Sequence, residues 1–394
     1  MRDGKIALVS ALCLAGQGQS WAQPLDQALV PPSWAVGQAE LRLGAEASGA
    51  LFDPDQPGWS GVQASGAFRL MPQVKRSTDS GLTLALDGTF TAADPLSRGR
   101  YDGDAIERLA GSAQTGLGKI EIGITDGAGY GLAVSGPRVD PGVSLNDPRT
   151  TFFRDPNSHR AVTNMFALRT PVGASSNYAK IAYTSPLLFG AQIALSFTPS
   201  EGKQFPFLNA GPHVPGRQVE FWEAAVRYEE ELGPVTLAGY GAVSESRAEH
   251  KRPGQEGTSD LGTGLKADYP LDEETSLSLG GAYRQSNAYG FDVNQTWQAG
   301  TTRVGHISTA VTRGPWMVGL EYGTGTADAV SNLPRLGLNG LEASLGYRLS
   351  DSIRVSSGWQ RLSYSRSAGV FFNGARQLKM DAVFLHLHLN TSEE

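Results

Sequence analysis

Residues 119–131 read Lys119-Ile120-Glu121-Ile122-Gly123-Ile124-Thr125 and then Asp126-Gly127-Ala128-Gly129-Tyr130-Gly131, so an alternating strand breaks at a glycine-rich bend. The next alternating segment starts only near Asn177. A connection of that length is uncommon in a compact domain and is usually functional or disordered. Its charges are mixed with apolar residues, which argues against a free tether. We therefore expect a long loop that packs against the rest of the chain, through apolar residues such as Phe152, Phe153, Met165, Phe166 and Leu168.

A two-residue periodicity extends from this stretch over most of the chain. Polar residues fall on even numbers in 40–48, and similar alternation recurs in 82–87, 189–198, 276–284, 341–350 and 353–360. Strict alternation is typical of strands with one polar and one apolar face, and no comparable stretch has a helical period. About sixteen such segments can be counted, most near the length that crosses a bilayer as a tilted strand.

The connections between these segments alternate in length. Short turns at 79–81, 116–118, 231–234, 313–315 and 350–351 are separated by longer loops, such as 94–104, 199–217, 246–260 and 365–376. This alternation places all tight turns at one end of a strand meander and all long loops at the other. Outer-membrane barrels have this arrangement, with short periplasmic turns and long outer loops.

The polarity of the two faces favours a membrane barrel. One face of each segment is apolar, and Trp59, Trp222, Trp316 and Trp359 fall near segment ends, as in an aromatic girdle. The other face carries charges, for example Glu40, Arg42, Arg69, Asp87, Lys119, Glu121, Arg227, Arg284, Arg348 and Arg354. A wide membrane barrel encloses water and needs such an inner face. The sequence therefore predicts an all-β fold, a transmembrane antiparallel β-barrel of about 16 strands over residues 38–389.

The N-terminal residues predict export. Arg2 and Lys5 precede an apolar run at 6–15 that is too short to span a membrane. The motif Ser20-Trp21-Ala22 then predicts a signal peptide over 1–22, cleaved between Ala22 and Gln23. We expect residues 23–37 to be an N-terminal extension and 390–394 a C-terminal tail. Cys13, the only cysteine, lies in the signal peptide, so thiolate metal sites and a cysteine nucleophile are excluded from the mature chain.

The composition agrees with this fold class. The chain has 49 glycines and only 18% charged residues, which suits strands and turns better than helices. Its net charge of −6, without a basic cluster, gives no sign of a nucleic-acid partner.

Two segments resemble a known family. The strand 118–123, which leads into a long acidic loop, and the segment 180–190, which continues to 197–199, look like those of Gram-negative general porins of the alphaproteobacterial type. The resemblance implies an outer-membrane homotrimer of water-filled channels for passive diffusion of small hydrophilic solutes and ions, without a cofactor. It also implies that the third outer loop, the segment quoted first, folds into the barrel.

The last strand departs from the family pattern. It ends in Leu389 and a polar tail, whereas such porins end with an aromatic residue. Its alternation also shifts, because its apolar residues are even-numbered up to Phe384 and odd-numbered from Leu385. A β-bulge would account for the shift.

A pore of this class needs opposed charges across a constriction, because a focused field selects solutes by charge. The acidic candidates in the long loop are Asp126, Asp140, Asp147 and Asp155, and the facing candidates are Arg42 and Arg69 on the first two strands. Arg138, Arg149, Arg154 and Arg160 share the loop, so the sign of the ion preference stays open.

Two rival functions remain at this point. An outer-membrane barrel enzyme of the phospholipase or protease type would need a nucleophile or an acid–base set, and no Gly-x-Ser-x-Gly motif is present. An adhesin-like barrel would use the outer loops for binding. His386 and His388 share a strand face, but two ligands without a third are a weak metal site. The glycine-rich bend lacks the βαβ context of a phosphate loop. We predict no catalytic, cofactor or metal site.

Overall fold

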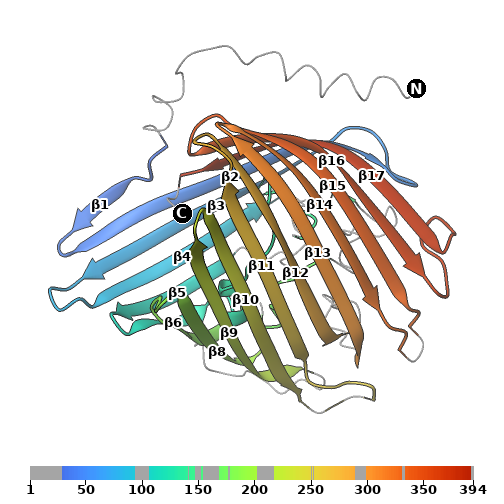
Figure 1. Ribbon diagram of the computed structural model, residues 1–394. Coiled ribbons are helices and arrows are strands. Elements are labelled where there is room, and N and C mark those ends of the chain that lie inside the picture. Colours follow the sequence, from blue (N-terminus) through green and yellow to red (C-terminus); the bar gives the residue numbers. More distant parts are fainter. Residues whose placement is uncertain are drawn as a thin grey trace.

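The computed structural model describes residues 29–93, 106–140, 142–146, 152–153, 168–175, 178–201, 217–249, 251, 253–288, 299–330 and 333–391. These residues form one closed antiparallel β-barrel (Figure 1). Its strands are β1 (Ser33–Val36), β2 (Ala39–Asp55), β3 (Gln63–Ser77), β4 (Thr83–Ala93), β5 (Ile106–Thr115), β6 (Gly118–Ile124), β7 (Ala179–Thr184), β8 (Ala191–Ser200), β9 (Gln218–Leu232), β10 (Val235–Ala248), β11 (Ser259–Pro270), β12 (Thr275–Ala288), β13 (Ala299–Arg313), β14 (Trp316–Ala327), β15 (Leu336–Arg348), β16 (Ile353–Arg366) and β17 (Gln377–Asn390).

The barrel has sixteen strands, β2 to β17. Each pairs with its neighbours in sequence, and β17 pairs with β2 to close the ring. The short β1 pairs with residues 39–42 of β2, just beyond residues 46–55, where β17 pairs. Strand β1 therefore continues the position of β17 along the same edge of β2 and adds no strand to the circumference.

The expected alternation of connections is confirmed. The turns at 116–117, 233–234 and 314–315 contain only two residues, and Gly233 and Gly314 supply the positive φ that such turns require. The other ends of the strands are joined by longer connections, the longest of which lies between β6 and β7. All long connections leave from one end of the barrel, which is the outer end in a barrel of this kind.

The side chains are arranged inside-out, as the pattern predicted. On β13, Val304, His306 and Ser308 point inward and are buried, whereas Ile307 between them is exposed on the outside. The same alternation holds on β14, where Glu321 is buried and Leu320 is exposed. An apolar exterior and a polar interior are typical of a barrel that is embedded in a bilayer and encloses water.

The bulge considered for the last strand is absent. Strand β17 pairs with β16 and β2 without a register shift, and its even-numbered residues, from Leu378 to His388, all face inward. The apparent change of face arises because the inward residues at the outer-loop end are apolar. Leu378, Met380 and Phe384 are buried in a cluster with Phe152 of the long β6–β7 connection. The change in the apolar pattern therefore reflects a packing surface inside the barrel and not a break in the strand.

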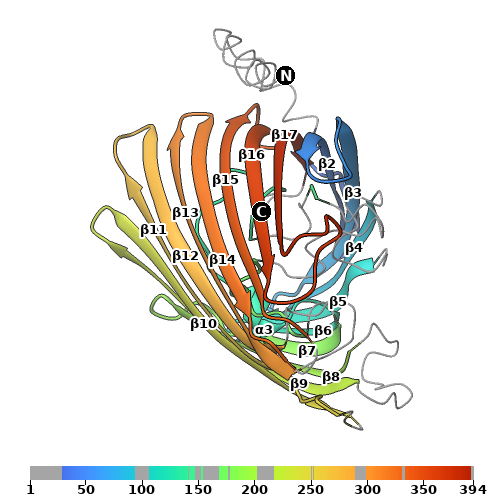
Figure 2. The same cartoon turned by 90° about the vertical axis from the view of Figure 1, so that its right-hand side faces the viewer.

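Helix content is minimal in the described residues. The helix α3 (Ala128–Gly131) is a single turn directly after β6 and lies against β7, β8, β9 and β10 (Figure 2). Within the described ranges no helix has the length and apolar character needed to span a membrane.

Candidate functional site

The described parts of the β6–β7 connection, residues 126–140, 142–146, 152–153 and 168–175, are here called the inner segment. They contact side chains of strands from several sides of the barrel, and these contacts come from the inward face of each strand. The inner segment therefore lies inside the barrel, where a segment of that kind can narrow the channel.

The first attachment of the inner segment is Glu223 on β9. Its buried carboxylate accepts hydrogen bonds from the backbone N–H groups of Gly129 (3.3 Å) and Ser175 (3.2 Å). Beside it, the Tyr240 hydroxyl donates to the Gly129 carbonyl at 2.6 Å, and the Lys180 ammonium donates to the Thr125 carbonyl at 2.6 Å. A buried carboxylate costs stability unless it is paired, so the two backbone N–H groups stabilise Glu223. Because these groups come from both ends of the inner segment, they also fix both ends to one wall.

The second attachment is Glu321 on β14. It accepts hydrogen bonds from the Ser144 hydroxyl at 2.7 Å and from the Leu145 N–H at 3.1 Å. His306 Nε2 lies 3.1 Å from the same carboxylate oxygen. A carboxylate of the barrel wall thus again holds the backbone of the inner segment, this time on β14, far from β9 around the barrel.

Asp140 makes the third attachment. Here the carboxylate belongs to the inner segment, and its partners on the barrel wall are His386 and Ser356. It is buried, lies 2.8 Å from His386 Nδ1 on β17, and accepts hydrogen bonds from the Ser356 hydroxyl and the Gly142 N–H. Burial raises the pKa of Asp140, but these hydrogen bonds, His386 first, outweigh it and leave the pKa below its ordinary value.

Apolar packing completes the attachment. The ring of Phe152 stacks on Phe52 of β2, with centroids 4.8 Å apart, and lies 5.2 Å from the ring of Phe384. Phe153 and Leu168 are buried in the same cluster. The expectation that these residues pack against the rest of the chain holds for the three that the structure describes; Met165 and Phe166 lie outside the described residues.

Glycines on the inner wall let the inner segment approach closely. A Cβ atom on Gly264 would lie 1.9 Å from the carbonyl oxygen of Val134, and one on Gly319 would lie 2.4 Å from Val139 Cγ2. A Cβ atom on Gly340 would lie 2.7 Å from Leu168 Cδ1. Sequence reasoning missed these glycines and the two carboxylates. The signal that could have found them is their place in the alternating pattern, because all of these residues fall on inward-facing positions of strands.

The basic candidates lie on the wall formed by β2 to β6. Arg42 lines a cavity of about 360 Å³ together with Arg108 of β5 and Lys119 of β6. Arg69 is half-buried and pairs with Glu46 at 2.9 Å and Glu107 at 3.3 Å. The structure thus brings Arg42 next to two further cations that were not among the candidates, and both of these pair with Glu121, while Arg69 sits in an ion-pair network of its own.

The acidic candidates are separated by the structure. Asp126 is exposed at the start of the inner segment, whereas Asp140 is buried against His386. Asp147 and Asp155 lie outside the described residues.

The histidine on β17 nearest the end of the strand, His388, lies 3.3 Å from Glu46. In the described part of the chain, no group of three or more His, Cys, Asp or Glu side chains is arranged to hold a metal ion.

A closed sixteen-stranded barrel with an apolar exterior, a polar interior and a segment attached to its inner wall defines an outer-membrane channel. The sequence profile described as Gram-negative porin matches residues 38–367. The chain therefore belongs to the Gram-negative porin family. It is an outer-membrane porin that provides a channel for passive diffusion, and the family consists of channels rather than enzymes.

Solved structures agree with this fold at low sequence identity. The OmpF–daunomycin complex of Salmonella typhi matches with a TM-score of 0.58 and 10% identity over 91% of this chain and 100% of that one. The anion-selective porin from Comamonas acidovorans has a TM-score of 0.55 and 11% identity over 89% and 99%. A trimer form of OmpT from Vibrio cholerae has a TM-score of 0.54 and 11% identity over 89% and 99%. No curated protein sequence matches the chain.

Proposed function

We propose that the inner segment forms the constriction of this porin, and that the wall carrying Arg42 and Arg69 faces it across the water-filled lumen. The observation that supports this most directly is the anchoring of the inner segment to Glu223 and Glu321, on opposite flanks of the path that it takes. A segment held at both places stays inside the barrel without covalent help. Small hydrophilic solutes and ions then pass between the inner segment and the basic wall.

We propose distinct roles for the charged candidates. Arg42 and Arg69, together with the neighbouring Arg108 and Lys119, set the field on one side of the lumen. Asp126, Asp147 and Asp155 supply carboxylates on the facing side. Asp140 contributes to the constriction by positioning the inner segment, because its carboxylate is already bonded to His386 and Ser356.

The test is planar-bilayer recording on the refolded mature chain with a salt gradient. Replacing Arg42 and Arg69 together with Gln shifts the reversal potential toward cations, since two positive charges leave the basic wall. Arg247→Gln is the matched control, because Arg247 is an exposed cation whose partner is Glu220 and it does not line the cavity beside Arg42. An unchanged reversal potential in the double variant removes both residues from the constriction.

A deletion tests the inner segment itself. Removing residues 142–146 takes away the hydrogen bonds to Glu321 together with part of the obstruction. The single-channel conductance is expected to rise, because the narrowest section of the path widens. An equal conductance in the deletion variant and the parent contradicts a role of this segment in the constriction.

We further propose that the porin assembles as a homotrimer. The trimer form of the similar Vibrio cholerae protein and the family resemblance support this assembly. Light scattering on the detergent-solubilised chain measures it directly, and recordings are expected to show conductance steps in groups of three. A monodisperse monomer that conducts in single steps overturns the proposal.

The chain limits are proposed from sequence alone. Residues 1–22 act as the signal peptide with cleavage between Ala22 and Gln23, residues 23–37 form an extension that includes β1, residues 38–389 form the barrel, and 390–394 form a tail that starts with the last residue of β17. The segment 180–190 supports an alphaproteobacterial subtype. N-terminal sequencing of the protein from outer membranes checks the cleavage site, since Gln23 is expected as the first residue.

A further inference from the structure

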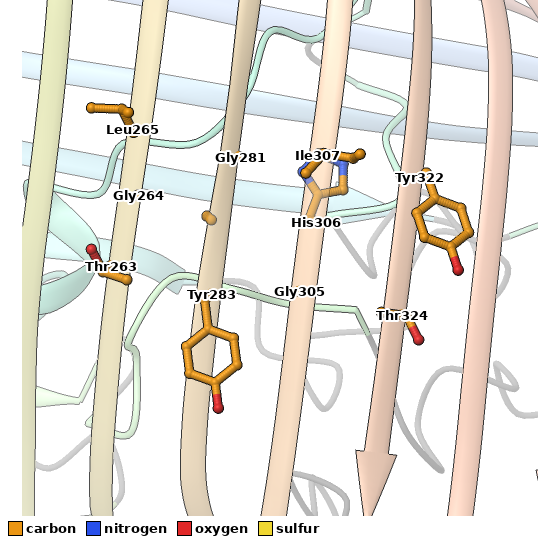
Figure 3. A pocket seen from close by; sticks show the side chains of 11 residues that line it. Thr263, Gly264, Leu265, Gly281, Tyr283, Gly305, His306, Ile307, Tyr322 and Thr324 are labelled. Atoms are coloured by element: carbon orange, nitrogen blue, oxygen red, sulfur yellow. The ribbon is translucent and has the colours of Figure 1, made fainter.

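A groove is present on the outer, membrane-facing surface of strands β11 to β14 (Figure 3). Its volume is about 390 Å³. Its walls are the side chains of Leu265, Tyr283, Ile307 and Tyr322, one from each strand, and Gly281 and Gly305 between them leave its floor open. None of these residues takes part in the channel described above.

The chemistry of the groove is apolar. Leu265 and Ile307 are about 60% exposed (60% and 59%), which is tolerable for such side chains only against an apolar neighbour. The one histidine at the groove, His306, turns its imidazole to the opposite face, where it contacts Glu321. A charged or strongly polar occupant would find no buried partner here.

The groove also has a direction. The hydroxyl groups of Tyr283 and Tyr322 both point to the end of the barrel where β14 runs into a long connection (Figure 3). The Tyr283 hydroxyl donates to Gln285 at 3.1 Å, and beyond it Arg303 pairs with Asp328 at 3.1 Å. Tyrosines mark the level of the lipid headgroups, so the groove starts at the outer interface and runs toward the bilayer centre.

We propose that this groove binds one acyl chain of an outer-leaflet lipid, with the headgroup beside the two tyrosine hydroxyls. The volume falls in the range of small-molecule sites. An unfilled hollow would lose dispersion contacts on all its walls, and a flexible chain restores them.

The experiment uses the full mature chain refolded into phosphatidylethanolamine vesicles that contain a small share of the same lipid with a photoactivatable diazirine in one acyl chain. After illumination, labelled peptides are mapped. Diazirine near the carboxyl end of the acyl chain is expected to label Tyr283, and diazirine near the terminal methyl is expected to label Leu265. Ile307 and Tyr322 lie directly opposite each other in the strand register and are expected to be labelled together. Labelling spread evenly over the outward residues of the barrel overturns the proposal.

A pair of glycine variants makes the test specific. A Cβ atom on Gly305 would meet nothing within 4 Å, so Gly305→Leu fills the groove without disturbing the strand. It is expected to reduce labelling of the four groove residues at least several-fold, with unchanged conductance as the sign of correct folding. Gly241→Leu is the control, since Gly241 is an outward glycine of β10 with only Val226 Cγ1 at 4.0 Å, and it leaves the labelling unchanged. Equal groove labelling in the parent and Gly305→Leu contradicts a lipid in the groove. Loss of conductance in Gly305→Leu transfers the test to Gly305→Val, for which the same two outcomes decide.

Discussion

At the scale of single residues, Glu342 on β15 is a buried carboxyl group that the fold provides with few partners. It is buried and stands directly across from Glu321 of β14 and Gln360 of β16 in the strand register. Gln360 donates to its Oε2 at 2.9 Å, but its Oε1 has no hydrogen-bond partner among the described residues. Two adjacent buried carboxyl groups, each with one oxygen that lacks a hydrogen-bond partner among the described residues, are expected to cost stability.

We therefore predict that Glu342→Gln stabilises the barrel by about 1–3 kcal/mol. The amide keeps the shape and the acceptor for Gln360 and removes one of the two adjacent buried carboxyl groups. Urea unfolding of vesicle-embedded protein measures the free energy of unfolding, and Glu231→Gln at the exposed end of β9 is the neutral control. A clear loss of stability in Glu342→Gln contradicts the prediction.

Asp140 gives a pH-dependent prediction. Because its pKa lies below the ordinary value of 3.8, its ionised form stabilises the attachment above that value, and this stabilisation disappears as the pH falls through the lowered pKa. A spin label at Ser135→Cys is expected to gain mobility only below pH 3.8. In Asp140→Asn the label should show no such transition. A wild-type label that stays immobile throughout that acidic window counts against Asp140 as an anchor.

At the scale of elements, the strands were predictable because their physical cause is local. A strand between water and lipid must alternate, so the outward Ile120 and Ile122 flank the inward Glu121 in the sequence itself. The attachments of the inner segment were not predictable in this way. Glu223 lies 94 positions from Gly129, and Glu321 lies 176 positions from Leu145. Alternation indicates that both glutamates face inward, but it contains no information on which backbone they meet.

The wall glycines give a prediction at the same scale. Gly264→Ala places a methyl group against the Val134 carbonyl, which a backbone group cannot avoid by rotation, so the inner segment must move off β11. We expect a stability loss of about 1–3 kcal/mol from overpacking and a higher conductance. Gly241→Ala on the outward face of β10 is the matched control. Unchanged conductance together with unchanged stability would refute the contact.

At the scale of the whole molecule, the orientation of the faces can be tested by depth. An arginine at Ile122, an outward residue of β6, is expected to destabilise the folded barrel in lipid by about 2–4 kcal/mol if it lies near the bilayer midplane. Leu345 on β15 should respond in the same way. Leu117→Arg, in the turn between β5 and β6, should be nearly neutral because that turn lies outside the hydrocarbon. Refolding yields into vesicles as a function of urea give the comparison, and a tolerated arginine at both strand positions would reverse the faces.

The seam between the two ends of the chain sets the order of events in biogenesis. Thr391 and Ala45 exchange hydrogen bonds across 346 positions, and β1 continues the line of β17 along the edge of β2. Closure of a loop that long is the most demanding contact to form by chance. The cylinder therefore cannot be sealed until the final strand has been delivered, and every earlier intermediate is an open sheet with two unsatisfied edges. Such an intermediate needs protection from aggregation until its last fourteen strand residues arrive.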